Sequence, residues 1–435
     1  MARAAQSAPA RSSQAKTVAK VTAVLEELVG DYRPRDFAVE LWDGTRWDPD
    51  PGQFCRFTWR IHHPRALRAA LRSDRQVAFG EAYIYGDFDI EGDILAIFPL
   101  AEYLEKKSFS TAAKVRLATL LLGLPTAGHV DGAGRKFSGR VHSKIRDRQA
   151  ISFHYDVSND FYQLWLDSGM VYSCAYFNCG EDPIDAAQAQ KLDYICRKLR
   201  LRPGERLLDI GCGWGGLIVH AARHYGVHAT GITLSEEQVA LAQERIAEAG
   251  LTAQCAVQLL DYRDAEPLGQ FDKVVSVGMV EHVGEDKLLE YFRSAFHLLK
   301  PGGAFLNHGI GRASNRQKPA EPTFTDVYVF PDGDLVPIST VLHHAGKAGF
   351  EVRDVENLRE HYFLTLSHWL RRLEAHQFEA RSLVGELKYL IWRLYLAGSA
   401  YYFQSGKLDL YQSLLVKTDT GRSGLPLTRN DWYLT

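Results

Sequence analysis

An aspartate followed by closely spaced glycines is the clearest chemical pattern in this chain. It lies in LLDIGCGWGG, residues 207–216, and comprises Asp209, Gly211 and Gly213. Glycines let the backbone turn sharply and approach a ligand closely, the helix that follows offers free N–H groups, and Asp209 can pair with an ammonium group. The spacing D-x-G-x-G is neither the G-x-G-x-x-G of dinucleotide folds nor a G-K-[ST] loop, which disfavours NAD and ATP. Taken alone, the same turn can also be a simple tight strand–helix connection.

Two further runs narrow the kind of ligand. LDYRDA, residues 260–265, follows the third expected strand, and KPGG, residues 300–303, precedes the fifth. Together with the glycine turn, they look like a methyltransferase that uses S-adenosylmethionine (SAM). The second strand of such proteins usually ends in an acid that binds the ribose hydroxyls, whereas here GITLSEEQ supplies Thr233 and Gln238. Gln238 is equally well placed as the capping-box partner of Ser235, and the two roles can coexist.

The elements that must position these residues alternate along the chain from about residue 185. Strands are expected at RLLDI, HATGI, AVQLL, FDKVVSV and AFLNHGI. Helices are expected at AAQAQKLDYICRKL, LIVHAARHYG, SEEQVALAQERIAEAG and EDKLLEYFRSAFHLLKPGG, the second closed by Gly226. Strands separated by helices predict a parallel, doubly wound sheet, whose ligands lie beyond the carboxyl ends of the strands.

The remaining sequence predicts a second, smaller unit. A chain of 435 residues is too long for one ordinary core. We expect a disordered tail over 1–20, an N-terminal α+β domain over 21–125, a basic linker over 126–150 and a catalytic domain over 151–435. In the α+β domain FAVEL and FTWRI are typical of strands, PRALRAALRS and DILAIFPLAEYLEK of helices, and FGEAYIYGDFDIEGD of turns between short strands. Between residues 135 and 148 the linker carries one acid, Asp147, against six cations: Arg135, Lys136, Arg140, Lys144, Arg146 and Arg148.

Composition excludes several classes of protein. The net charge of −2 gives no general attraction to nucleic acid. No apolar run approaches the ~20 residues of a membrane-spanning helix, and the N-terminus has no signal-peptide core. The six cysteines form no C-x-x-C pair and the sequence holds no H-E-x-x-H motif, so we expect no metal site and a reduced, cytoplasmic chain.

Longer runs carry a family resemblance. ISFHYDVSNDFYQLWLDSGMVYSCAYF, VGMVEHVG, FLNHGIG, VYVFPDGD, ENLREHYFLTLSHWL and YLAGSAYYFQSGKLDLYQ occur in this order with the glycine turn. Over essentially all of 151–420 the chain closely resembles the cyclopropane-fatty-acyl-phospholipid synthases, and VAFGEAYIYGDFDIEGD resembles the N-terminal domain of the longer bacterial members. The resemblance implies a Rossmann-like α/β methyltransferase domain with a smaller N-terminal α+β domain.

The resemblance also implies site residues and a product. It implies that SAM is held by Tyr172, Ser173, Asp209, Gly211, Gly213, Thr233, Gln238, Asp261 and Tyr262. It implies a bound bicarbonate held by Cys174, Glu281, His308, the backbone of Ile310 and Tyr395, although Tyr401 and Tyr402 lie near the last of these. The expected substrate is an unsaturated phospholipid at the inner face of the membrane, and a homodimer is possible. Val280, Phe153 and the AGSA after Tyr395 depart from the common family pattern, which leaves the acyl preference open.

The expected chemistry explains these residue types. An alkene that accepts a methyl group becomes a carbocation, which water would quench, so apolar and aromatic walls are needed. Candidates are Tyr328, Phe330, Tyr362, Trp369 and Tyr395, each of which is as readily a core residue. Ring closure then needs a base, and bicarbonate can serve if Glu281 accepts its O–H while His308 and backbone N–H groups donate. Taken singly, His308 can be structural, Glu281 a surface acid and Cys174 a core residue.

Three other readings remain open at this level. The same scaffold can methylate amines, or leave a methyl or methylene branch on the acyl chain, and a non-catalytic lipid-binding protein would share the same domains. Docking on anionic membranes is expected through the basic linker and through the arginines of a helix in the first domain, Arg65, Arg68, Arg72 and Arg75. The alternative for these cations is a solvated basic surface.

Overall fold

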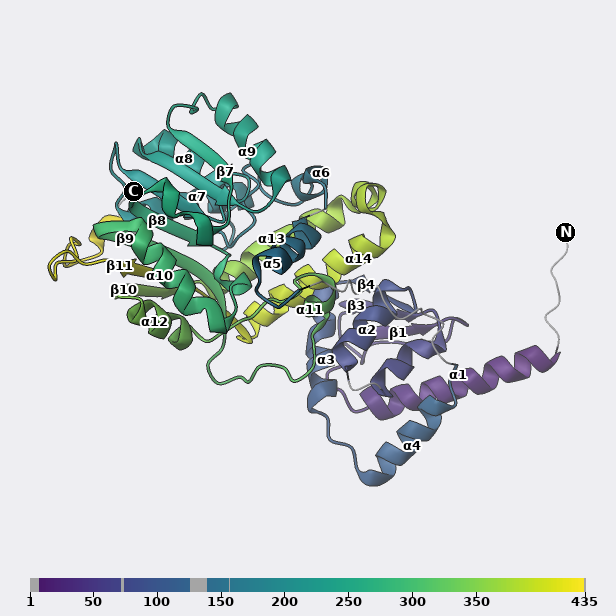
Figure 1. Cartoon of the computed structure of the whole chain (residues 1–435). Helices are drawn as coiled ribbons and strands as arrows, with labels where there is room; N and C mark the ends of the chain where they lie inside the picture. Colours follow the sequence, from purple (N-terminus) through teal and green to yellow (C-terminus); the bar gives the residue numbers. More distant parts are fainter. Residues whose placement is uncertain (1–7, 72–73, 126–138, 156, 434–435) are drawn as a thin grey trace. The chain divides into compact units, whose positions relative to one another are not determined.

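The computed structural model describes residues 8–71, 74–125, 139–155 and 157–433 (Figure 1). The chain divides into two compact units. The smaller unit takes its residues from 1–135, 319–328 and 386–398, and the larger unit from 136–318, 329–385 and 399–435. The catalytic domain expected over 151–435 therefore gives two segments to the smaller unit, and the part of the expected linker described from 139 onward belongs to the larger one.

The smaller unit is a four-stranded sheet with helices. The strand order is β2-β1-β3-β4, in which β1 and β3 are parallel and the other pairs antiparallel. The strands are β1 (Phe37–Leu41), β2 (Arg46–Trp47), β3 (Phe57–Ile61) and β4 (Phe88–Gly92). The helices are α1 (Ala8–Val29), η1 (Pro64–Leu71), α2 (Arg75–Ile84), η2 (Ile94–Ala96), α3 (Ile97–Lys106), α4 (Thr111–Leu122) and α11 (Phe324–Tyr328). Its core includes Phe37 stacked on Phe57 at a ring-centroid distance of 5.0 Å.

Two local predictions in this unit differ from the structure. The segment expected as a disordered tail is helical from Ala8, because α1 carries an apolar stripe at Val21, Val24 and Leu25 that is buried and supports the whole helix. The run 79–93, expected as turns between strands, begins inside α2. Its Gly80 suggested a turn, but a Cβ there would lie 2.2 Å from the Phe324 ring, so this glycine permits close packing within a helix.

The larger unit contains the predicted doubly wound sheet. The strand order is β10-β11-β9-β8-β5-β6-β7, parallel from β9 to β7. The strands are β5 (Arg206–Ile210), β6 (His228–Thr233), β7 (Cys255–Leu259), β8 (Phe271–Val277), β9 (Leu299–Arg312), β10 (Glu351–Asn357) and β11 (Leu408–Val416). All five predicted strands are present, whereas β10 and the antiparallel β11, which lies between β10 and β9, were not predicted.

Helices cover both faces of this sheet. Helices α7, α8 and α9 pack on one face and α10 and α12 on the other (Figure 1). Leu207 and Leu208 of β5 show the alternation, because they belong to the cores of opposite faces. The α-helices of the unit are α5 (Lys144–Tyr155), α6 (Asn159–Gln163), α7 (Ile184–Leu199), α8 (Gly216–Tyr225), α9 (Glu236–Glu248), α10 (Leu288–Leu298), α12 (Ile338–Lys347), α13 (Arg359–Ala375) and α15 (Asn430–Tyr433), with short 3₁₀ turns η3 to η6 between β7 and α10.

Two helices differ from the domain boundaries expected from the sequence. The expected linker ends in α5, which begins at Lys144 and so belongs to the larger unit. Helix α14 (Gln377–Gln404) is interrupted at Gly385, where the backbone has φ 80° and ψ 164°, and its residues 386–398 belong to the smaller unit. Among the described residues, no helix is both long enough and apolar enough to cross a membrane.

Candidate active site

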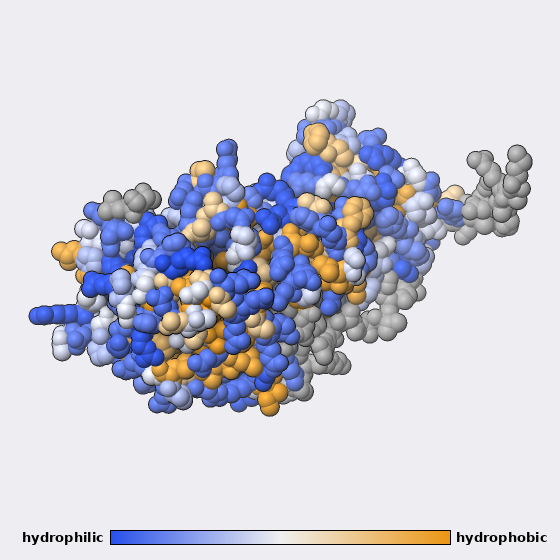
Figure 2. Space-filling model, turned by 90° about the horizontal axis from the view of Figure 1, so that it is seen from above, coloured by the Kyte–Doolittle hydropathy of each residue, from blue (hydrophilic) through white to orange (hydrophobic). Residues whose placement is uncertain are grey.

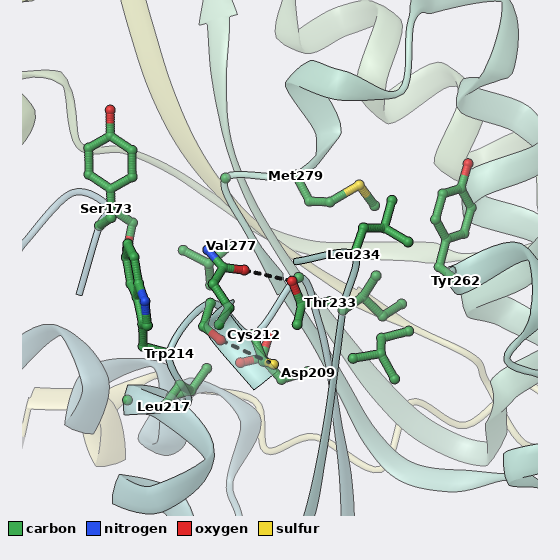
Figure 3. Close-up of a pocket in the computed structure, with 18 of the residues that line it drawn as sticks. Ser173, Asp209, Cys212, Trp214, Leu217, Thr233, Leu234, Tyr262, Val277 and Met279 are labelled. Atoms are coloured by element: carbon green, nitrogen blue, oxygen red, sulfur yellow. Dashed lines mark hydrogen bonds between the residues drawn. The ribbon is translucent and has the colours of Figure 1, made fainter. Parts of the chain in front are cut away.

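A cavity of about 150 Å³ opens in the larger unit where four parallel strands end. It is lined from the carboxyl ends of β5, β6, β7 and β8, the position at which doubly wound sheets hold their ligands. All nine residues predicted to hold SAM line this one cavity: Tyr172, Ser173, Asp209, Gly211, Gly213, Thr233, Gln238, Asp261 and Tyr262. Figure 3 shows Ser173 and Trp214 on one side of it, Tyr262 and Leu234 on the other, and Asp209 and Thr233 between them.

The glycine turn forms the floor of the cavity. Gly211 has φ +83° and Gly213 φ +54°, in the left-handed region where a side chain is strained. A Cβ at Gly211 would lie 3.3 Å from the Met279 side chain, whereas at Gly213 the space is open. The turn is anchored to the next strand, because the N–H groups of Gly211 and Cys212 both donate to the carbonyl of Ile232, at 2.9 and 3.0 Å. The backbone therefore comes close to whatever occupies the cavity.

Asp209 is a buried carboxyl group beside a buried amine. Burial raises the pKa of Asp209 to about 7, and the charge of Lys191 opposes this rise. Among the described residues, its Oδ1 has no hydrogen-bond partner. Lys191 is itself 1% exposed, and its Nζ donates to Ser173 Oγ at 2.7 Å. Burial lowers the pKa of Lys191 to about 8, against the charges of Asp167, Cys174 and Asp209. A cationic ligand would stabilise the ionised form of Asp209.

The two interpretations of Gln238 prove compatible. Its backbone N–H donates to Ser235 Oγ at 3.3 Å, so Ser235 caps α9 as predicted. Its side chain does not complete the capping box, because Gln238 Oε1 accepts from Thr233 Oγ1 at 2.6 Å. The Thr233 hydroxyl is thereby fixed at the cavity wall, and the amide nitrogen of Gln238 is left to donate to a ligand.

Asp261 is held by an arginine. Arg263 donates to both carboxylate oxygens of Asp261, at 2.8 and 2.6 Å, and also to Asp147 Oδ2 at 3.0 Å. Burial raises the pKa of Asp261, but the bonds and charge of Arg263 outweigh it and hold that pKa below its usual value. Tyr262 packs edge-on against Tyr291 with ring centroids 5.5 Å apart. The α5 segment thus contributes Asp147 to one wall of the cavity.

The residues predicted to hold bicarbonate do not line this cavity, although Cys174 directly follows the lining residue Ser173 and Glu281 directly precedes the lining residue His282. Glu281 Oε1 accepts from the N–H of Ile310 at 2.7 Å, so that backbone donor is already used. Within the part of the chain that the structure describes, Glu281 Oε2 and His308 Nε2 are buried and have no hydrogen-bond partner. Burial raises the pKa of Glu281 to about 7. Burial, together with the charges of Lys191 and Lys198, holds the pKa of His308 well below its usual value.

Cys174 and Tyr395 are placed differently. The Cys174 thiol is fully buried and donates to the carbonyl of Ala175 at 3.2 Å, and burial raises its pKa, so it stays protonated. The charge of Lys191 lowers the pKa of Cys174, against the effect of burial, and also lowers that of His308. Tyr395 lies on α14 in the smaller unit, and its role at this site stays a prediction.

The aromatic candidates are divided between the two units. Trp369 packs against Tyr172 of the cavity wall at 5.3 Å between ring centroids, and Tyr362 packs edge-on against Trp369 at 6.1 Å. The ring centroids of Phe330 and His282 lie 5.6 Å apart. Tyr328 belongs to the smaller unit, where its hydroxyl donates to Glu81 at 3.0 Å. Among the described residues, no group of three or more His, Cys, Asp or Glu could hold a metal ion.

Several residues of the site were not identified from the sequence. Lys191 lines the cavity, and Gln412 and Lys198 lie behind His308. The spacing of residues in α7 could have identified the two lysines, because Gln188, Lys191 and Lys198 share one helical stripe with the apolar Ile195. In the structure the three polar residues are each 1% exposed. Polar residues at core spacing indicate a buried polar site. Trp214 could have been proposed from its place inside the glycine turn.

Comparison with known proteins finds similar sequences and structures among methyltransferases and cyclopropane synthases. Residues 142–413 match the model of a family described as mycolic acid cyclopropane synthetase, and residues 24–114 match a domain of unknown function. A probable fatty acid methyltransferase of Pseudomonas putida is 42% identical over 399 residues, which cover 91% of this chain and 95% of that protein. The cyclopropane-fatty-acyl-phospholipid synthase of Escherichia coli K12 is 39% identical over 259 residues, covering 60% of this chain and 65% of that protein. A mycolic acid cyclopropane synthase solved in complex with SAH and CTAB is 33% identical, with a TM-score of 0.59 over 62% of this chain and 97% of that one.

Proposed function

Because this chain belongs to the mycolic acid cyclopropane synthetase family and is a SAM-dependent enzyme, we propose that it builds cyclopropane rings on phospholipids. The reaction transfers a methylene unit from SAM to the cis double bond of an unsaturated acyl chain. The E. coli relative, named for this activity, supports the phospholipid substrate. The relative from P. putida is named only as a fatty acid methyltransferase, which keeps branched products as a competing outcome.

The observation that carries this proposal is a pair of buried polar groups without hydrogen-bond partners among the described residues. One is on His308 of β9, and the other is on Glu281, which accepts a hydrogen bond from Ile310 of the same strand. Glu281 Oε2 can accept a hydrogen bond and His308 Nε2 can donate one, and neither has a partner within the described residues. Leaving buried polar groups unpaired is costly, so a ligand that pairs with both groups would stabilise this region. Bicarbonate fits because it carries both an O–H donor and anionic acceptor oxygens. When bound, it would supply the base that removes a proton from the transferred methyl group.

The chain's own residues have three tasks in this reaction. Asp209 binds the ammonium group of SAM, and the glycine turn brings backbone against the ligand. Glu281, His308 and the Lys191 charge orient the base and balance its charge. The Tyr172–Trp369 aromatic cluster excludes water and presents ring faces to the developing cation.

The product made from SAM with a fully deuterated methyl group tests the reaction. With unsaturated phospholipid vesicles, we expect an acyl product that keeps two of the three deuterium atoms and carries a saturated ring, because ring closure requires the loss of one deuteron to the base. Mass spectrometry of the acyl chains, with mild hydrogenation to reveal any double bond, gives the measurement.

The competing outcomes have different signatures. Methyl transfer to an amine or oxygen keeps all three deuterium atoms, since the acceptor loses its own proton. A saturated methyl branch also keeps all three, whereas a methylene branch keeps two but is hydrogenated. Three retained deuterium atoms would refute the cyclopropane assignment and leave the SAM-dependent fold intact. Binding of SAM without any turnover would favour the alternative of a non-catalytic lipid-binding protein.

We also propose that the enzyme docks on anionic membranes through α5 and the residues just before it. Three of the six predicted linker cations form ion pairs within the larger unit: Lys144 with Asp264 at 2.6 Å, Arg146 with Asp332 at 2.6 Å and Arg148 with Glu236 at 3.1 Å. The side chains of Lys144 and Arg148 are about half exposed. Ion pairs at such exposed positions are weak enough to exchange for pairs with lipid phosphates. Ile145 beside them is 70% exposed, a combination typical of interfacial segments.

Other cations named for docking are less suitable. Arg65 is paired with Asp87, and Arg68 donates to the carbonyls of Leu122 and Leu124, so both stabilise the smaller unit. Arg72, Arg135 and Lys136 lie outside the residues whose side chains the structure describes. On the face seen in Figure 2, hydrophobic residues gather in patches between hydrophilic ones.

Vesicle binding tests the docking surface. Each cation near an anionic surface contributes about 1 kcal/mol, so we expect the double variant Lys144→Gln/Arg148→Gln to bind anionic vesicles more weakly, by up to about 30-fold. Wild-type binding should fall as salt rises from about 0.05 to 0.5 M. Arg353→Gln on β10, which also removes one arm of an ion pair, is the control and should bind normally. Binding that responds to neither salt nor anionic lipid would show that these cations are only a solvated surface.

A further inference from the structure

The two nitrogens of His308 face different partners. His308 lies on β9 and Gln412 directly opposite on β11, and each is 1% exposed. Gln412 Nε2 lies 3.1 Å from His308 Nδ1. The other ring nitrogen, Nε2, is the buried atom that has no partner among the described residues. One side of the ring is therefore fixed by the sheet, and the other makes no hydrogen bond among the described residues.

A buried lysine decides which way the Gln412 amide points. Gln412 Oε1 accepts from Lys198 Nζ at 2.8 Å, and Lys198 is 1% exposed. Lys198 also forms an ion pair with Glu356, which in turn accepts from the Tyr194 hydroxyl at 3.0 Å. If the amide were reversed, its NH₂ group would face the ammonium of Lys198, placing donor against donor. The NH₂ group is thus directed at His308.

This arrangement determines where the imidazole carries its proton. An amide NH₂ can only donate, so His308 Nδ1 must accept, and a neutral ring then has its proton on Nε2. The burial described above keeps the ring neutral. We propose that Gln412, oriented by Lys198, is a positioning residue that fixes His308 as the Nε2–H tautomer, so that a hydrogen-bond donor faces the active site. The effect of this tautomer on turnover rests on the proposed function, whereas the tautomer itself does not depend on it.

The tautomer can be observed without any turnover. In protein labelled with ¹⁵N at its 16 histidines, long-range ¹H–¹⁵N spectra distinguish a protonated from an unprotonated ring nitrogen. The His308→Asn variant assigns the signals by their loss. We expect the wild type to show His308 with unprotonated Nδ1 and protonated Nε2. A His308 that is protonated at Nδ1 in the wild type would overturn the inference.

Two substitutions at 412 test the cause. In Gln412→Glu the carboxylate can only accept, so we expect Nδ1 of His308 to become protonated. In Gln412→Met no donor remains, so we expect a mixture of tautomers, and this variant keeps the test available if the glutamate disturbs folding. A His308 spectrum unchanged in both variants would show that Gln412 has only a packing role.

Controls separate this inference from the proposed function. Ser413→Ala changes the next buried residue of β11, whose hydroxyl has no partner among the described residues, and should leave the His308 spectrum and turnover unchanged. In Gln412→Glu we expect kcat to fall about 10- to 100-fold with the Kd for SAM unchanged, the scale of effect seen for residues that orient a functional histidine. A changed tautomer with normal turnover would support the positioning role and refute the part given to His308 in the reaction.

Discussion

We expect Glu281→Gln and His308→Ala each to lower kcat by about 100-fold or more, while the Kd for SAM should change by less than about threefold. Neither residue lines the cofactor cavity, and their proposed task is to position the base, for which losses of 10²–10⁴ are typical. An interaction made only on the way to the transition state appears in kcat and not in cofactor binding. Turnover on unsaturated phospholipid vesicles and SAM titration by calorimetry give the two measurements.

The bicarbonate part of this prediction has its own test. Exhaustive removal of carbon dioxide should lower wild-type turnover and added bicarbonate restore it, whereas Glu281→Gln should respond to neither. Glu285→Gln, at an exposed acid one turn further on, is the matched control and should remain active. Full wild-type activity after bicarbonate removal would contradict this role for Glu281 and His308.

Loss of folding cannot account for the expected defect of Glu281→Gln. Burial raises the folded-state pKa of Glu281 from 4.5 to about 7. Its contribution to stability is therefore fully present below pH 4.5 and is lost as the pH rises through about 7, by roughly 3 kcal/mol in total. The glutamine variant never ionises, so above pH 7 we expect it to be more stable than the wild type by up to this amount. Thermal unfolding at pH 5 and pH 8 measures the difference.

The cofactor cavity was predictable because its residues follow strands of a parallel sheet. Asp209, Thr233 and Asp261 each lie at or just after the end of a strand, and such ends meet at one edge. Periodicity therefore predicted the sheet, and the motifs predicted which side chains gather there. The predicted family and fold class are confirmed by the family match and by the structure.

The support behind the cavity was not predictable by the same means. Gln412 reaches His308 across 104 residues, from an antiparallel strand that no local pattern had indicated. Lys191 and Lys198 look like solvent-facing positions of an amphipathic helix, because charged residues are rarely fully buried. Gly80 suggested a turn for an equally non-local reason, its contact with Phe324. In each case a tertiary contact outweighs the local propensity on which sequence reasoning depends.

Replacement of Asp209 should have the largest effect on cofactor binding. Removing one partner of a buried charge pair typically costs 2–5 kcal/mol, so Asp209→Asn should weaken SAM binding by about 30- to 5000-fold. The pKa of Asp209 is raised to about 7 by burial, so the uncharged variant is not expected to unfold; ionisation of the wild-type group lowers stability as the pH rises through about 7. Asp286→Asn, at an exposed acid of the same unit, is the control.

The pH dependence of this binding distinguishes a direct role for Asp209 from a structural one. A cationic ligand binds the ionised carboxylate, and the free protein holds this group protonated below about pH 7. The wild-type affinity for SAM should therefore fall as the pH is lowered from 8 to 5.5, by up to about tenfold for each unit below 7, with a proton released on binding in that range. Asp209→Asn should bind weakly and independently of pH, without proton release. Calorimetry in two buffers of different ionisation enthalpy measures both quantities, and wild-type binding that is flat across this range with no proton release would show that Asp209 does not meet the charge of the ligand.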